Sequence, residues 1–242
     1  MQLPTVLTVT HSPTESVARL GGWLSGAGLL LDVRSPYDGS PLPPLRGFAG
    51  LLVLGGPMGA YDEDVAPWLP ATRDLLRDAV AQQVPTLGIC LGGQLLAAAL
   101  GGQVKPASEG PEIGQGLVAK RDVSAGDPLF GPVPFTPDVL QWHWDEITTL
   151  PAGATLLASS TRYPNQAFRV GERAWGLQFH VETTPEMVRT WAAGDRDRLA
   201  GEGWDVDAAL ASWDLDTLHA DLEEVWRPFA SRFAEVVRTA SS

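Results

Sequence analysis

The chain contains a single cysteine, Cys90, which lies in the motif GICLG at residues 88–92. An apolar, strand-like run precedes it and a helix-like run follows it, so Cys90 is predicted to occupy a sharp strand-to-helix turn. The backbone is strained in such a turn, and flanking glycines avoid collisions there. The N-terminus of a helix also favours a thiolate over a thiol. A lone cysteine is more often a buried structural residue, but this context predicts a nucleophile.

A nucleophile that attacks an amide carbonyl needs N–H donors for the oxyanion that develops. The N–H of Leu91, at the start of the predicted helix, is the expected first donor. A second glycine turn, GGP at residues 55–57, follows the apolar run 51–54. Alone, this turn indicates only a tight exit from a strand. Together with the cysteine turn, it predicts the N–H of Gly56 as the second donor.

The cysteine also needs an imidazole that accepts its proton and later protonates the leaving nitrogen. His180 ends the strand-like run 175–179, and Glu182 follows two residues later. A carboxylate at this offset can turn back and hold the imidazole N–H, as the third member of a triad does. The alternative is a strand-end histidine that bonds a backbone carbonyl. The nearby Glu182 favours a catalytic His180.

The other three histidines fit this role less well. His219 lies among acidic residues of a helical tail, which predicts a solvated helix face. His11 follows the first strand and either caps a loop or lines the site. His143, in the stretch QWHWD at residues 141–145, is either a buried structural residue or a substrate-side residue. No second His or Cys stands at metal-ligand spacing from His180, and one cysteine excludes a multi-cysteine zinc site, so no metal is expected.

The elements that must position these residues alternate between short apolar runs and helix-like segments, which predicts a mostly parallel sheet joined by crossover helices. Strands are expected at 5–10, 29–34, 51–54 and 86–89, and helices at 15–24, 71–82 and from Cys90 to residue 100. Between residues 103 and 180, the pieces 117–120, 155–159, 166–170 and 175–179 predict antiparallel strands. Apolar residues at three-to-four spacing in 208–213 and 218–237 predict amphipathic helices.

Composition limits the classes of partner. The 242 residues include 29 acidic and 17 basic ones, so the formal charge of −12 disfavours nucleic acid and anionic membranes. No signal-like or membrane-spanning apolar run is present, and a cytoplasmic location is expected. The nine tryptophans, several of them in the tail, are expected to pack in the core and between helices, with a partner interface as the alternative.

Three motifs resemble those of a known family, the class I (triad-type) glutamine amidotransferases. They are GGP at 55–57, GICLGGQ at 88–94 and QFHVE at 178–182, in the family's order and spacing, and the resemblance extends through residue 186. It implies a flavodoxin-like α/β fold with a mostly parallel central sheet, flanking helices and some antiparallel strands. It also implies a triad of Cys90, His180 and Glu182. Gln94, Gly55 and His143 are the candidates for substrate binding.

The segment 112–114 and the QWHWD stretch resemble a stand-alone branch of that family, whose members are similar to the glutaminase domain of GMP synthase and to γ-glutamyl peptidases. Two positions depart from the family pattern. Many members carry His or Met where this chain has Gly93, which is expected to alter the substrate pocket. Many carry Pro where this chain has Val181, which removes a backbone constraint on the turn. Both departures leave the triad intact.

The resemblance therefore implies a glutaminase or amidotransferase that cleaves the glutamine side-chain amide through a cysteine thioester, giving glutamate and ammonia for an unknown acceptor, without a cofactor. Two alternatives stay open: a γ-glutamyl peptidase or hydrolase with the same triad, and a non-catalytic regulatory or binding module. No ATP-pyrophosphatase loop of the SGGxDS kind is present, so a separate synthetase subunit is an open partner, as is a second copy of the chain. The expected organisation is one class I domain over residues 1–242, with 184–242 as a helical C-terminal extension.

Overall fold

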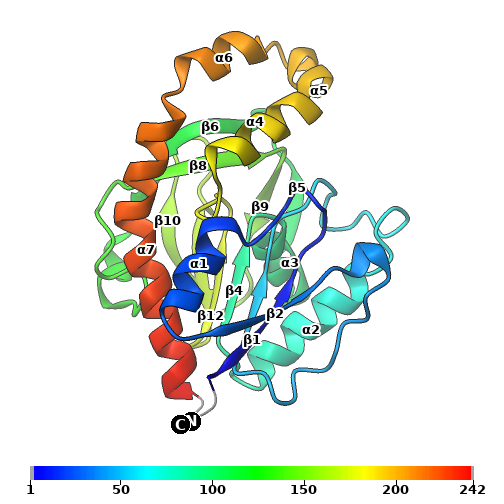
Figure 1. Ribbon diagram of the computed structural model, residues 1–242, viewed down its shortest axis with the longest axis vertical. Coiled ribbons are helices and arrows are strands. Elements are labelled where there is room, and N and C mark those ends of the chain that lie inside the picture. Colours follow the sequence, from blue (N-terminus) through cyan, green and yellow to red (C-terminus); the bar gives the residue numbers. More distant parts are fainter. Residues whose placement is uncertain (1–2, 241–242) are drawn as a thin grey trace.

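The computed structural model describes residues 3–240, and an eight-stranded sheet forms the centre of this part of the chain (Figure 1). In spatial order the strands are β2 (Leu30–Arg34), β1 (Thr5–Val9), β3 (Gly50–Val53), β4 (Thr86–Ile89), β12 (Ala174–Leu177), β11 (Ala167–Val170), β10 (Thr155–Ser159) and β7 (Ala119–Lys120). The strands from β2 to β12 run parallel, and the remaining three continue antiparallel. The predicted mixed α/β fold with a mostly parallel sheet is confirmed.

Helices cover both faces of the parallel strands, because successive side chains of a strand point to opposite faces. In β3, Leu51 and Val53 pack in one apolar layer with α2 (Leu69–Ala81) and α3 (Leu91–Ala99). Leu52 packs in the other layer with α1 (Ala18–Gly26) and α7 (Leu215–Ala240). Burial on both faces explains why these strands read as continuous apolar runs in the sequence.

The parallel arrangement brings distant segments to one edge of the sheet. The carboxyl ends of β1, β3, β4 and β12 meet at the same edge, and ligand sites of open α/β sheets form there. His11, Gly55, Cys90 and His180 follow these four strands in the chain. The residues that the sequence singled out therefore share one edge of the sheet.

The region between residues 103 and 180 differs most from its prediction. It adds two antiparallel pairs, β5 (Gln103–Pro106) with β9 (Asp145–Thr149) and β6 (Glu112–Leu117) with β8 (Asp138–His143). The predicted strand 117–120 is divided between the end of β6 and the short β7. The strand predicted at 175–179 is antiparallel to β11, as expected, but it runs parallel to β4. Short 3-10 turns lie at Pro36–Asp38 and Asp122–Gly126.

The C-terminal segment is helical, as predicted. It forms α4 (Pro185–Gly194), α5 (Arg196–Gly201), α6 (Val206–Ser212) and the long α7. Figure 1 shows α7 along one side of the molecule next to α1, and α4 to α6 at the end that carries β6 and β8. The apolar stripe of α7 is buried at three-to-four spacing, with Trp226, Phe229 and Phe233 fully enclosed. The tail tryptophans therefore pack between elements, as the sequence predicted.

Two local predictions need correction. The helix expected from Glu15 begins only at Ala18, because residues 12–17 form a loop in which Glu15 N–H donates to the Ser12 carbonyl. His219 was predicted on a solvated face but is buried, with its ring nitrogens at 2.6 Å from the Leu215 carbonyl oxygen and 3.2 Å from Thr183 Oγ1. The acidic neighbours in the sequence face solvent while His219 packs inward. Among the described helices, none is both long and apolar enough to cross a membrane.

Candidate active site

Cys90 stands at the turn between β4 and α3, with backbone angles φ 51° and ψ −110°. A positive φ is uncommon outside glycine, and such strain concentrates at functional sites. Neighbouring glycines make room for the turn. A Cβ on Gly92 would lie 2.0 Å from the Val53 carbonyl oxygen, and a Cβ on Gly88 would lie 2.5 Å from the Gly92 oxygen. The close approach of β3, β4 and α3 thus requires the predicted glycines.

Gly93, the next glycine of the same motif, packs against strand β12. A Cβ there would lie 2.5 Å from the Leu177 carbonyl oxygen of β12. Gly93 is also not among the described residues that line the cavity beside Cys90. In this chain Gly93 therefore packs against the sheet, and the expectation that this position alters the substrate pocket stays a prediction.

The glycine turn after β3 lies directly beside the cysteine turn. A Cβ on Gly56 would lie 2.8 Å from both Leu91 Cδ2 and His11 Cβ. As the first residue of α3, Leu91 has an N–H group without an intrahelical acceptor. His11 supports this turn from the buried side, where its Nδ1 accepts a hydrogen bond of 3.0 Å from Trp68 Nε1. Of the two roles considered for His11, loop support is the one that this packing matches.

His180 and Glu182 form a buried pair. His180 Nδ1 lies 2.7 Å from Glu182 Oε1, and the other carboxylate oxygen accepts a 2.9 Å hydrogen bond from the Val181 N–H. A proline at position 181 would lack this donor. The His180 backbone pairs with Leu140 of β8, and its ring packs against Trp191 of α4, with the ring centroids 4.8 Å apart and the planes tilted by 56°. The imidazole is thus held by a carboxylate, a strand and an aromatic ring.

The charges around His180 favour its imidazolium form. Burial acts to lower the pKa of His180, but the charges and hydrogen bonds of Glu182 and Cys90 outweigh burial and hold this pKa well above its usual range. Cys90 Sγ also lies 3.8 Å from the Trp142 carbonyl oxygen. The structure therefore brings together Cys90, His180 and Glu182, in the order that proton transfer between a thiol and an imidazole requires.

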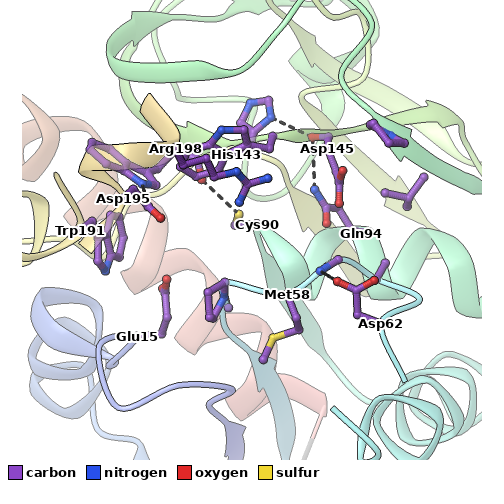
Figure 2. A pocket seen from close by; sticks show the side chains of 18 of the residues that line it. Glu15, Met58, Asp62, Cys90, Gln94, His143, Asp145, Trp191, Asp195 and Arg198 are labelled. Atoms are coloured by element: carbon purple, nitrogen blue, oxygen red, sulfur yellow. Dashed lines mark hydrogen bonds between the residues drawn. The ribbon is translucent and has the colours of Figure 1, made fainter. Parts of the chain in front are cut away.

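A cavity of about 540 Å³ opens above Cys90 (Figure 2). Its walls come from the loop after β1, the glycine turn and residues after it, the start of α3, the β8–β9 turn, and the C-terminal helices α4 and α5. Figure 2 shows Asp62, Asp145 and Gln94 on one side of Cys90, and Glu15 and Trp191 on the other. The buried His180 lies next to the latter side, because its ring packs against the Trp191 ring.

Comparison with protein families identifies the family of this chain. The family model of class-I glutamine amidotransferases matches residues 33–190. The chain belongs to the class-I glutamine amidotransferases. The match includes all three motifs that carried the resemblance. Trp191, Asp195 and Arg198, which form the C-terminal wall of the cavity, lie beyond it.

Relatives of this class-I glutamine amidotransferase include a protein of similar length and a much longer enzyme. The chain is 29% identical over 227 residues to the glutamine amidotransferase-like protein YfeJ of Salmonella typhimurium, covering 90% of this chain and 93% of YfeJ. It is 39% identical over 141 residues to the glutamine-hydrolysing GMP synthase of Thermomicrobium roseum, covering 58% of this chain but only 24% of that enzyme. A crystal structure of a glutamine amidotransferase from Thermotoga maritima superposes with a TM-score of 0.84 at 30% identity, covering 97% of this chain and all of that one.

The three candidates for substrate binding lie in different environments within the amidotransferase. Gln94 lines the cavity, and its Nε2 lies 3.3 Å from both the Asp145 carbonyl oxygen and Gln178 Oε1. His143 also lines the cavity, but both ring nitrogens are engaged. Nδ1 lies 2.9 Å from the Asp145 carbonyl oxygen, and Nε2 lies 3.2 Å from Glu112 Oε2. Gly55 does not line the cavity among the described residues; it leaves space between Glu15 and His180.

A buried polar network holds His143 in place. Besides His143, Glu112 accepts hydrogen bonds from Ser160 and Gln166. Burial acts to raise the pKa of Glu112, but these hydrogen bonds and the charge of His143 outweigh it and hold the pKa below its usual range. His143 therefore combines the two readings that the sequence left open, because it is both fixed structurally and exposed to the cavity.

Sequence reasoning missed the charged residues of the cavity, among them Glu15, Asp62, Asp145 and Arg198. Asp145 belongs to the QWHWD stretch, so the proximity of His143, a candidate for substrate binding, could have pointed to it. The other three come from separate segments. The Arg198 guanidinium lies 4.0 Å from the centroid of the Trp144 ring and forms no ion pair with another described residue. Burial raises the pKa of Asp145, although the charge of Arg198 acts to lower it; Asp62 contributes to the rise.

One group of described residues could bring ligand atoms to a metal ion. Glu15, His180 and Glu182 offer ligand atoms within 4.8 Å of one another. Glu182 already holds His180 Nδ1, however, and a cation there would compete with that hydrogen bond. The pairing of imidazole and carboxylate matches a proton-transfer site better than a metal centre.

Proposed function

We propose that this protein hydrolyses the side-chain amide of L-glutamine, giving glutamate and ammonia through a thioester on Cys90. The observation that supports this most strongly is the convergence of Cys90 and the hydrogen-bonded pair of His180 and Glu182 at one cavity. Membership in the class-I glutamine amidotransferases supports the same reaction. The intact triad makes a purely regulatory or binding role the weaker reading.

The proposed reaction has two stages. Cys90 Sγ attacks the side-chain carbonyl carbon, a C–S bond forms, and the carbonyl electron pair moves to the oxygen, where Leu91 and Gly56 N–H groups are the proposed donors. His180 passes the proton taken from Cys90 to the amide nitrogen, the C–N bond breaks and ammonia leaves. Water then attacks the thioester and gives a proton to His180. Glutamate is released as Sγ departs as a thiolate.

The charges near the cavity mouth suit the free end of an α-amino acid. Oδ2 of Asp62 and Oδ2 of Asp145 lie 3.1 and 3.2 Å from the point where a Cβ on Gly59 would stand, so two carboxylates face a gap that a side chain there would fill. Opposite charges attract a ligand across such a site. We assign the α-ammonium to these carboxylates, the α-carboxylate to Arg198, and the side-chain amide to Gln94 and Cys90.

Two further features belong to this proposal. GMP synthases are glutamine-hydrolysing by name, and this chain matches about a quarter of their length. We infer that the ammonia acceptor is activated by a separate synthetase subunit, since the chain has no SGGxDS loop. We also infer that residues 1–242 act as one class I domain, with α4 to α7 as an extension that supplies one wall of the cavity.

A γ-glutamyl peptidase or hydrolase with the same triad is the second candidate. The cavity volume of about 540 Å³ lies within the range that holds drug-sized ligands. A γ-glutamyl compound larger than glutamine therefore fits the site. Only the leaving group differs between the two reactions.

The experiment measures ammonia and glutamate released from L-glutamine by the wild-type protein and by Cys90→Ala and Cys90→Ser variants. The proposal predicts release by the wild type and a loss of at least about 1,000-fold in both variants, because the nucleophile is removed. Circular dichroism checks that the variants fold. Undiminished release by a folded Cys90→Ala variant would sink the assignment.

A further inference from the structure

Glu15 presents a carboxyl group to the catalytic imidazole from a second direction. Its Oε2 lies 2.9 Å, and His180 Cε1 3.1 Å, from the point where a Cβ on Gly55 would stand. Part of the residue is exposed, but Oε2 is buried and has no hydrogen-bond partner in the described part of the chain. Glu15 also lines the cavity above Cys90. An unpartnered buried carboxyl oxygen at a cavity wall is costly unless a ligand uses it.

The position of Glu15 relates it to one part of the substrate. The nitrogen that leaves must receive its proton from His180, so the leaving group lies on the His180 side of Cys90. Trp191 marks that side, because its ring packs against His180 with the centroids 4.8 Å apart. Figure 2 shows Glu15 next to Trp191, across Cys90 from Asp62 and Asp145. Glu15 therefore borders the space where the leaving group departs, away from the charges assigned to the α-amino acid end.

We propose that Glu15 determines leaving-group specificity, favouring ammonia and disfavouring amines that carry a carboxylate, such as the amino acids of γ-glutamyl peptides. This inference rests on the proposed amide hydrolysis at Cys90. The carboxyl oxygen can accept an N–H of the departing ammonia. A carboxylate on the leaving group would instead lie close to Glu15 in a site of low dielectric, where like charges repel strongly.

The strength of this selection depends on the charge of Glu15. Burial raises the pKa of Glu15 to about 8; His180 acts to lower it, while Glu182 and Asp195 raise it further. These groups face Glu15 from the segment after β12 and from the end of α4, and Cys90 and Arg198 line the same cavity. Below pH 8 the carboxyl group is mostly neutral and the repulsion is weak. Above pH 8 it is ionised, so the discrimination grows.

The test compares kcat/KM for L-glutamine with kcat/KM for γ-glutamylglycine at pH 6.5 and pH 9. Both substrates have the same γ-glutamyl part, so titration of Cys90, His180 and the α-amino group acts on both rates and cancels from their ratio. The wild-type preference for glutamine is expected to rise about tenfold between the two pH values. The Glu15→Gln variant, which keeps the shape and removes the charge, is expected to show a ratio that does not change with pH and stays near the wild-type value at pH 6.5.

Asp62→Asn is the matched control, because it removes a carboxylate of the same cavity on the other side of Cys90. It is expected to weaken both substrates equally and to keep the wild-type rise of the ratio with pH. If neither substrate is cleaved in a Cys90-dependent way, the proposed hydrolysis itself is overturned. If glutamine is cleaved but the wild-type ratio stays flat, or Glu15→Gln keeps the wild-type dependence, only the role of Glu15 is overturned. The wild-type measurement decides this even where Glu15→Gln does not fold.

Discussion

Two carboxyl groups lie against the His180 imidazole and act on it in different ways. Glu182 holds Nδ1 at 2.7 Å and is itself fixed by the Val181 N–H, so it orients the ring and stabilises its charged form. Glu15 approaches near Cε1 without a hydrogen-bond partner among the described residues. The first arrangement suits a permanent triad member, and the second suits a group that acts on what enters or leaves the cavity.

Replacing Glu182 with Gln tests the first of these roles. Glu182 raises the pKa of His180, so its loss lowers that pKa, and the imidazolium that we propose as the proton donor to the leaving nitrogen is lost at a lower pH. We expect kcat for glutamine to fall by about 100-fold or more, and the alkaline limb of the kcat–pH profile to shift to lower pH. A profile of kcat against pH for both proteins measures this.

Glu172→Gln is the control for that measurement, since Glu172 is an exposed glutamate in the turn between β11 and β12. It is expected to leave both kcat and the profile unchanged. A Glu182→Gln variant with a wild-type profile would contradict the assignment of Glu182 as the partner of His180.

Side chains that act together could be predicted from the sequence where they are neighbours in the chain. His180 and Glu182 are two residues apart, so their pairing followed from local geometry. Glu15, Asp62 and Arg198 come from three distant segments, and nothing in their local sequence indicates a common cavity. The prediction that His219 is exposed to solvent was wrong for a related reason. Acidic neighbours in the sequence do not reveal which face of a helix is buried.

The cysteine turn depends on how closely three elements approach one another. Gly92 lets the start of α3 pass over the backbone of β3, and a Cβ there would lie 2.0 Å from the Val53 carbonyl oxygen. Backbone cannot yield as a flexible side chain can. The strained Cys90 conformation is therefore maintained by packing between β3, β4 and α3, together with the hydrogen bond of 2.8 Å from the Cys90 N–H to the Leu177 carbonyl oxygen.

Gly92→Ala is expected to lower the free energy of unfolding by about 3 kcal/mol, because the methyl group overpacks the crossing of α3 and β3. Urea unfolding followed by tryptophan fluorescence measures this. Gly22→Ala is the matched control in α1, since a Cβ there meets nothing within 4 Å. It is expected to stabilise by about 0.5 to 1 kcal/mol, the usual gain for alanine over glycine in a helix. Equal effects of the two substitutions would contradict the packing argument.

Elements were predictable where burial gave them a simple pattern. The central strands β1, β3 and β4 are buried on both faces and bounded by turn residues, so their apolar runs located them within a residue or two. The antiparallel pairs of β5 with β9 and of β6 with β8 lie outside the eight-stranded sheet, and β5, β8 and β9 were not predicted. The parallel pairing of β12 with β4 depends on a contact between strands about 90 residues apart, which no local pattern encodes.

At the scale of the whole molecule, the first helix, α1, and the last helix, α7, pack in the same apolar layer. α1 and α7 contact each other, and the buried side chains of α7 belong to the same core as Val6 of β1 and Trp175 of β12. The Phe233 ring meets Trp175 edge-on at 6.5 Å. If α7 is part of one domain with the sheet, as we propose, it unfolds together with the sheet.

Phe233→Ala is expected to cost about 3 to 5 kcal/mol, the usual effect of removing an enclosed aromatic ring. Urea unfolding monitored by both tryptophan fluorescence and far-ultraviolet circular dichroism should show coincident transitions in the wild type and the variant. Glu224→Ala, at an exposed site of the same helix, should change stability by less than about 0.5 kcal/mol. An early separate transition of helical signal would show that α7 unfolds independently.

The most direct measurement is mass spectrometry of the protein quenched in acid during turnover of L-glutamine. Hydrolysis through Cys90 predicts an adduct with the mass of one γ-glutamyl group, located on the peptide that contains Cys90 and absent from the Cys90→Ala variant. Glutamate release without such an adduct on Cys90, together with an active Cys90→Ala variant, would contradict the assignment of Cys90 as the nucleophile.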